Sequence, residues 1–191
     1  MELGLRIGLW TLIAGGMGAL PLAWAIGRWG MGVEIRSFGD GNPGAMNVLR
    51  AGGWRWFLPA LLLEFLKGAA PIALARWIGG LSGWALVPPA LAAPLGHAFT
   101  PWLRFRGGKA LAVTFGVWCG LTEWRVPMLL GGLFAVTLRL FRAEGQAVRA
   151  GMLALNLLLG GAALAGFADI SLWAVALGHT LLLFWTHRRS S

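Results

Sequence analysis

The amino-acid sequence predicts an all-α integral membrane protein with about seven transmembrane helices. Hydrophobic residues make up 58% of the 191 residues, and the mean hydropathy is +0.71. Only 12% of the residues are charged, whereas a soluble domain has about 25%. Such a chain lacks the charges that a water-soluble surface needs, so lipid is the expected solvent for most side chains. No linker divides the sequence, and residues 1–191 are expected to form a single polytopic membrane domain.

Apolar stretches supply the predicted helices. They cover residues 7–27, 57–75, 79–98, 110–122, 126–141, 148–167 and 170–186. The first stretch lacks a small-residue cleavage signature and is long enough to span a bilayer, so we expect a transmembrane helix and not a removed signal peptide. The fourth and fifth stretches are short, which favours tilted or partly re-entrant helices. The sequence shows no convincing internal repeat and no interrupted helix.

The distribution of positive charge predicts the orientation of these helices. Twelve of the 16 basic residues fall in the odd-numbered loops or the C-terminal tail: Arg28, Arg36, Arg50, Arg55, Arg104, Arg106, Lys109, Arg139, Arg142, Arg149, Arg188 and Arg189. The even-numbered side carries only Arg6, Arg76 and Arg125. By the positive-inside rule, the odd loops and the C-terminus are cytoplasmic and the N-terminus lies outside. The net charge of +9 is therefore explained by anionic lipid, and no nucleic-acid partner is expected.

Two predicted cytoplasmic loops contain residues suited to binding phosphate. In the first, Gly39, Gly41 and Gly44 allow positive φ and close backbone approach, so that successive N–H groups can form an anion-binding nest. Asn42 and Asn47 add neutral donors, and Arg50 offers a planar guanidinium. The sequence there is equally compatible with ordinary glycine turns and basic membrane anchors.

The second loop ends in Gly107-Gly108-Lys109, directly before an apolar helix. Exposed N–H groups, a positive helix end and an ammonium group together suit a phosphate. His97 opens this loop and is a candidate substrate contact. Because both glycine-rich loops lie on one predicted face, the pair favours phosphate binding more than either loop alone.

Ionisable residues also lie within the predicted spans. Glu64 and Lys67 are three residues apart on one helical face, so they are either functional or a mutually neutralising pair that supports helix packing, and we favour the support role. His179 is expected to be a hydrogen-bonded core residue. No zinc pattern, Walker A motif or nucleophile elbow is present, and the single Cys119 excludes an intramolecular disulfide.

At these loops the chain resembles the acyl-phosphate-dependent glycerol-3-phosphate acyltransferases, the PlsY family. The first family motif appears as Gly39-Asp40-Gly41-Asn42-Pro43-Gly44-Ala45-Met46-Asn47-Val48-Leu49-Arg50. The second appears as Glu64-Phe65-Leu66-Lys67-Gly68, and the third as Gly96-His97-Ala98-Phe99 followed by Phe105-Arg106-Gly107-Gly108-Lys109-Ala110. The resemblance covers nearly the whole chain.

The resemblance implies a bacterial inner-membrane enzyme of phospholipid biosynthesis. It would transfer an acyl group from acyl phosphate to the 1-hydroxyl of glycerol 3-phosphate, without a metal, a cofactor or a protein partner, and give lysophosphatidic acid and phosphate. The implied catalytic residues are Lys109, Arg50 and His97. The implied substrate-binding residues are Gly39, Asp40, Gly41, Asn42, Gly44, Asn47, Gly107, Gly108, Arg142 and His187.

Several positions depart from the family pattern. Asp40 replaces a serine, Met46 a threonine, and Arg142 and Gly145 two later serines; the tail His187-Arg188-Arg189-Ser190-Ser191 lacks the family's Asn and glutamate. An ionised Asp40 about 4 Å from a phosphate charge would repel it by about 4 kcal/mol at an effective dielectric of about 20. Two alternatives therefore stay open: a low-activity paralogue with a changed acceptor, and a small anion or lipid transporter, which would be expected to show inverted repeats and interrupted helices.

Overall fold

The computed structural model describes residues 2–188, in which helices joined by turns are present and strands are not. The elements are α1 (Leu3–Ala19), α2 (Leu22–Ala25), the π-helical turn η1 (Ile26–Gly30), η2 (Ile35–Ser37), α3 (Ala45–Gly52), α4 (Trp54–Trp77), η3 (Gly83–Leu86), α5 (Val87–Ala98), η4 (Pro101–Leu103), α6 (Leu111–Thr122), α7 (Arg125–Leu140), α8 (Glu144–Leu164) and α9 (Ile170–Thr186). Arg189, Ser190 and Ser191, which entered the charge count and the tail motif, lie outside the described residues.

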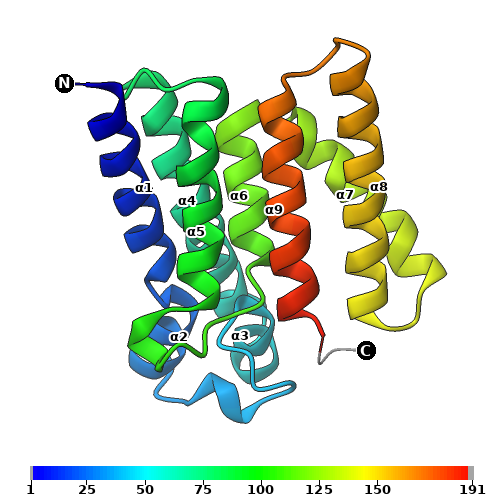
Figure 1. Ribbon diagram of the computed structural model, residues 1–191. Helices are drawn as coiled ribbons and strands as arrows, with labels where there is room; N and C mark the ends of the chain where they lie inside the picture. Colours follow the sequence, from blue (N-terminus) through cyan, green and yellow to red (C-terminus); the bar gives the residue numbers. More distant parts are fainter. Residues whose placement is uncertain (1, 189–191) are drawn as a thin grey trace.

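The long helices run up and down through the molecule, and the start of α1 lies at the end opposite to the end of α9 (Figure 1). Each of the seven predicted apolar stretches overlaps one of α1 and α4–α9. The connecting segments 28–53, 99–110 and 141–143 lie at the same end as residue 188 (Figure 1). We call this end the basic end, because it carries the basic loops that the sequence analysis placed on one side of the membrane.

The first helix is interrupted, contrary to the prediction of a continuous span. Helix α1 ends at Ala19, and Leu20 adopts an extended conformation with φ −64° and ψ 120°. Pro21 then caps the start of the short α2. A proline lacks the N–H for the helical ladder and disfavours the helical conformation of the residue before it, which explains the break.

Helix α5 begins later than the apolar pattern of 79–98 predicts. Gly80 and Gly83 have φ of +62° and +52°, so the chain turns there before the 3-10 turn η3. A proline follows at the start of α5, a position where its missing N–H costs nothing. The apolar residues of 79–86 therefore form a turn and a 3-10 turn that pack on the bundle, and not an α-helical segment.

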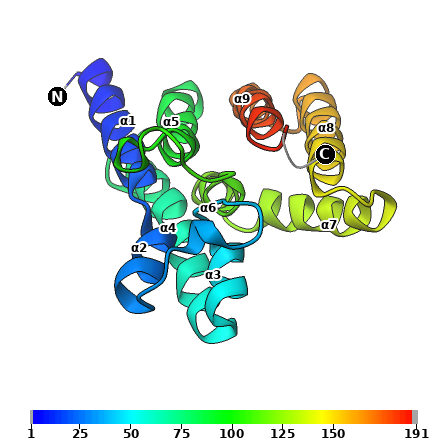
Figure 2. The same cartoon turned by 90° about the horizontal axis from the view of Figure 1, so that it is seen from below.

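Glycine allows the closest helix packing. Helix α1 packs against α5, and α4 packs against α6 (Figure 2). A Cβ at Gly18 would collide with the backbone of Ala93, and a Cβ at Gly116 would collide with the backbone carbonyl of Phe65. Small residues let helix backbones approach in this way in membrane proteins, where dispersion contacts drive association.

The outer surface of the bundle is apolar. Leu12, Leu157 and Leu181 are 77%, 78% and 73% exposed. Within the described residues, three helical segments are long and apolar enough to cross a bilayer: Leu3–Gly30, Trp54–Trp77 and Glu144–Leu164. Exposed apolar side chains spread over several helices are unfavourable in water and suit contact with lipid.

Candidate active site

A glycine-rich loop of residues 39–44 places Asp40 at the basic end. Gly39 and Gly41 have φ of +55° and +73°, a conformation that glycine adopts without strain. A Cβ at Gly39 would also collide with the guanidinium of Arg50, so this glycine lets the loop lie against α3. Gly44 has an ordinary φ of −93° and caps the start of α3.

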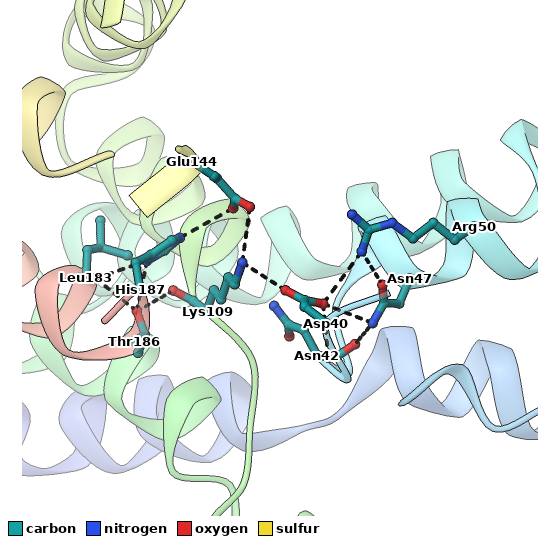
Figure 3. Close-up of polar contacts among 9 residues, drawn as sticks. All are labelled: Asp40, Asn42, Asn47, Arg50, Lys109, Glu144, Leu183, Thr186 and His187. Atoms are coloured by element: carbon teal, nitrogen blue, oxygen red, sulfur yellow. Dashed lines mark hydrogen bonds and ion pairs between the residues drawn. The ribbon is translucent and has the colours of Figure 1, made fainter. Parts of the chain in front are cut away.

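Asp40 lies at the centre of a set of hydrogen-bond donors (Figure 3). Its Oδ2 lies 2.8 Å from Lys109 Nζ, and its Oδ1 lies 3.6 Å from Arg50 Nη1. Oδ1 also accepts hydrogen bonds of 3.2 Å from the backbone N–H of Asn42 and from the side-chain amide of Asn47. Burial opposes ionisation, but the Lys109 ammonium and the Asn42 N–H outweigh it and hold the pKa of Asp40 below its usual range. An ionised Asp40 thus joins two residues that the sequence assigned to catalysis.

Lys109 also contacts a second carboxylate, which the sequence did not predict as part of the site. Its Nζ donates to Glu144 Oε2 at 3.1 Å, and Glu144 Oε1 lies 3.7 Å from His187 Nε2 (Figure 3). Burial and the Lys109 charge lower the pKa of His187, although the backbone carbonyl of Leu183 opposes this. Glu144 begins α8. A single acidic residue at a helix start in a basic loop was the sequence signal that could have identified it as part of the site.

Gly107 and Gly108 differ in role from the prediction. Their N–H groups donate to the carbonyls of Ala98 and His97, at 3.1 and 3.3 Å, so they are not open to a phosphate. A Cβ at Gly108 would collide with Nε2 of His97, so the glycine allows this loop segment to lie against the ring. Lys109 precedes the helix start by two residues, because Ala110 caps α6 in a left-handed conformation.

Behind this loop, Glu64 forms a buried polar cluster. Its Oε2 lies 2.6 Å from Lys67 Nζ and 3.1 Å from His97 Nδ1. The pair also satisfies the break in the first helix: the Ala23 N–H donates to Glu64 Oε1 at 2.9 Å, and Lys67 Nζ donates to the Leu20 carbonyl at 2.6 Å. These contacts agree with the predicted support role and extend it, because they also orient the imidazole of His97.

Two cavities meet at this site. A polar cavity of about 880 Å³ opens at the basic end, and its lining includes Glu34, Arg36, Ser37, Arg106, Gly107 and Gly108. An apolar cavity of about 910 Å³ runs along α4, α6 and α7, and its lining includes Leu58, Leu62, Phe65, Leu111, Phe115, Trp124 and Phe134. Asp40, Asn42 and Lys109 line both cavities, while Arg50, His97 and His187 line the apolar one.

Two predicted site residues, Gly39 and Arg142, line neither of these cavities. The Arg142 side chain is exposed, and Glu144 from the same segment reaches Lys109 instead. His179, which the sequence assigned to the core, is buried and its Nε2 lies 3.1 Å from the Ala90 carbonyl. Among residues 2–188, no three His, Cys, Asp or Glu side chains are grouped as metal ligands would be.

Comparisons with known proteins connect this site to one family. A family model described as glycerol-3-phosphate acyltransferase matches residues 8–191. A glycerol-3-phosphate acyltransferase of Thermus thermophilus is 38% identical over 191 residues, covering 95% of this chain and 88% of the relative. One from Thermotoga maritima is 43% identical over 117 residues, covering 60% of this chain and 58% of the relative.

The fold is similar to that of a solved membrane enzyme. Crystal structures of PlsY, an integral membrane glycerol 3-phosphate acyltransferase, superpose with TM-scores of 0.83 in the glycerol 3-phosphate form and 0.82 in the lysophosphatidic acid form. The sequence identities are 27% and 26%, and each comparison covers 96% of this chain and 88% of the other. The resemblance that the three sequence motifs carried is thereby confirmed: this chain belongs to the glycerol-3-phosphate acyltransferase family that includes PlsY.

Proposed function

We propose that this protein transfers an acyl group from acyl phosphate to the 1-hydroxyl of glycerol 3-phosphate, giving lysophosphatidic acid and inorganic phosphate. The observation that carries the proposal is the junction of a polar and an apolar cavity at Asp40, Asn42 and Lys109. A water-soluble acceptor and a lipid-soluble donor have to meet at such a junction. The forms in which PlsY was solved, with glycerol 3-phosphate and with lysophosphatidic acid, support the same acceptor and product.

The two cavities divide the substrates by polarity. Arg106 lines the polar cavity at the basic end, where it can attract the phosphate of the acceptor; Arg36 also lines this cavity but is paired with Glu34 at 2.9 Å. Leucine and phenylalanine side chains of α4, α6 and α7 line the apolar cavity, which suits an acyl chain. The reacting carbonyl would then lie next to Lys109, which borders both cavities.

Acyl transfer at this junction needs one bond to form and one to break. The acceptor hydroxyl oxygen attacks the carbonyl carbon of the acyl phosphate, an ester bond forms, and the bond from that carbon to the phosphate oxygen breaks. Lys109 and Arg50 would stabilise the negative charge on the carbonyl oxygen and the leaving phosphate. Because the donor is already an activated anhydride, holding the two anions in the correct orientation supplies most of the remaining acceleration.

The hydroxyl proton needs an acceptor, and His97 is placed to take it. Its Nδ1 is fixed by Glu64 at 3.1 Å, which leaves Nε2 as the nitrogen that can act as the base. His97 lines the apolar cavity beside Lys109. A carboxylate that holds one ring nitrogen also stabilises the imidazolium formed when the other accepts a proton.

The orientation of the molecule in the membrane follows from its charge. We propose seven crossings of a bacterial inner membrane, with the N-terminus outside and the basic end in the cytoplasm, where soluble glycerol 3-phosphate is available. The up-and-down course of α1 and α4–α9 supports this number of crossings (Figure 1). The proposed reaction requires no nucleic acid, cofactor or protein partner.

Phosphate release by the purified protein tests this function. Full-length protein in detergent is mixed with acyl phosphate and glycerol 3-phosphate, and phosphate and lysophosphatidic acid are measured together. We expect equal amounts of both, dependent on glycerol 3-phosphate and lost in Lys109→Ala. Phosphate release that is independent of the acceptor, or no release by the wild-type protein, would reject the proposal.

A changed acceptor is the second candidate, and Asp40 is the observation that favours it. Its carboxylate already occupies donors that would otherwise bind the phosphate of glycerol 3-phosphate. A panel of alcohols with and without phosphate, offered in the same assay, separates the two candidates.

The transporter alternative has less support: the interrupted helix that it requires is present at Pro21, but Glu64 and Lys67 satisfy the backbone groups of the break.

A further inference from the structure

The donors around Asp40 form an anion-binding site that the chain's own carboxylate fills. Lys109 Nζ, Arg50 Nη1, the Asn47 amide and the Asn42 backbone N–H all approach the two oxygens of Asp40, at 2.8 to 3.6 Å. Two cations and two neutral N–H donors around two oxygens are the arrangement that a phosphate would require. Without the Asp40 carboxylate, these donors would all be directed at its position, which borders both cavities.

We propose that Asp40 is an internal counter-anion, which the phosphate of a substrate has to displace before it can bind Lys109 and Arg50. This inference rests on the proposed function, because it identifies the group with which the substrate's phosphate competes. Asp40 belongs to the same chain and is therefore present at a high effective concentration. A singly charged ligand gains little by replacing it, whereas a phosphate monoester carries a second charge and interacts more strongly with the two cations. The competition lowers the apparent affinity of every anion by the same factor, so at a given concentration a phosphate monoester fills the site where a more weakly bound monoanion does not.

The backbone around Asp40 allows the displacement. Glycine lies on both sides of it, with Gly39 and Gly41 at positive φ, so a change in backbone angles there meets no Cβ. The Asp40 side chain is 39% exposed and lines the polar cavity, so it can move into water without opening the bundle. Lys109 keeps Glu144 as a partner at 3.1 Å when Asp40 leaves.

Direct binding of inorganic phosphate to the purified full-length protein tests the proposal. Isothermal titration compares the wild type with Asp40→Asn and Asp40→Ser, which remove the charge, and with Asp40→Glu, which keeps it. Glu123→Gln is the matched control, because it removes one negative charge between α6 and α7, at the opposite end of the molecule from the basic end. We expect phosphate to bind at least about tenfold more tightly to Asp40→Asn and Asp40→Ser, and Asp40→Glu and Glu123→Gln to gain no affinity.

Dimethyl phosphate, a monoanion, tests whether Asp40 competes with anions in general. It is expected to bind Asp40→Asn and Asp40→Ser measurably and the wild type at least about tenfold more weakly, since only the wild type keeps the competing carboxylate. Unchanged or weaker phosphate binding in both neutral variants would overturn the proposal, and so would an equal gain in Glu123→Gln. If one neutral variant fails to fold, the other provides the measurement.

The binding experiment and the acyl-transfer assay can fail separately. Tighter phosphate binding by the neutral variants in a protein that transfers no acyl group would leave the counter-anion in place and reject the proposed function. Active wild-type enzyme without tighter binding in these variants would retain the function and reject the counter-anion.

Discussion

The carboxylate of Glu64 lies 3.1 Å from Nδ1 of His97, and both side chains are buried inside the bundle. The same carboxylate oxygen lies 2.6 Å from Nζ of Lys67. One acidic residue therefore neutralises a buried lysine and fixes the imidazole that borders the apolar cavity. In the proposed mechanism this single group contributes both to stability, through Lys67, and to catalysis, through His97, and mutations can separate the two contributions.

Glu64→Gln is expected to destabilise the protein because it leaves Lys67 buried without a counter-charge. Loss of one partner from a buried ion pair costs about 3–5 kcal/mol. The double variant Glu64→Gln with Lys67→Met removes both charges and should recover more than half of the loss. Thermal unfolding in detergent measures the effect; equal unfolding temperatures for the single and double variants would show that charge pairing is not its source.

Lys109→Ala is expected to reduce kcat/KM by at least about a hundredfold, as for loss of a group that stabilises transition-state charge. Arg106→Ala deletes the same charge from the same loop but lines only the polar cavity, so its loss should stay below about tenfold. The phosphate-release assay compares the two variants. Equal losses would mean that total charge matters and the placement of Lys109 does not.

Gly108→Ala tests whether the ring of His97 has to lie against the Gly107-Gly108 segment during catalysis. The added methyl group would collide with His97 Nε2, so kcat should fall by at least about tenfold with little change in KM. Gly132→Ala on α7 is the matched control, because a Cβ there has no neighbour within 4 Å. Full activity in Gly108→Ala would contradict the assignment of Nε2 as the proton acceptor.

Trp124→Ala is expected to extend the range of acyl chains that the enzyme accepts. Trp124 lines the apolar cavity near the end opposite to Lys109 and stacks on Phe65, with ring centroids 6.4 Å apart. Removing the indole should raise the relative rate with longer acyl phosphates. Trp77→Ala, an exposed residue of α4 outside both cavities, should leave the chain-length profile unchanged. An identical profile in Trp124→Ala would place the chain elsewhere.

The sequence predicted the helices better than their ends. Apolar stretches located α1 and α4–α9, because hydrophobicity reports which segments avoid water. The break at Pro21 was missed, although a proline within an apolar stretch is a sequence signal for it; the partners that satisfy the broken backbone lie on α4, more than 40 residues later. Periodicity along one segment carries no information about such distant hydrogen bonds.

Within the site, sequence patterns identified residue types and missed their pairings. Arg50, Asp40 and Lys109 were predicted, and they do come together. The carboxylate of Glu144 and the carbonyl partners of Gly107 and Gly108 were not predicted, because both depend on how separate loops pack. The glycine pattern therefore predicted correctly that another group approaches the backbone closely. The prediction took this group to be a phosphate, whereas it is another part of the chain.

The interrupted first helix has a consequence for biosynthesis. When α1 leaves the ribosome and enters the membrane, the Leu20 carbonyl and the Ala23 N–H have lost their helical partners. The groups that replace these partners, the Lys67 ammonium and the Glu64 carboxylate, have not yet reached the membrane. Unsatisfied backbone groups are costly in lipid, and so are an isolated glutamate and lysine. The break after α1 and the side chains of α4 therefore satisfy each other's polar groups. We therefore expect α1 to stay at the translocon until α4 arrives, so that they enter the bilayer as a pair.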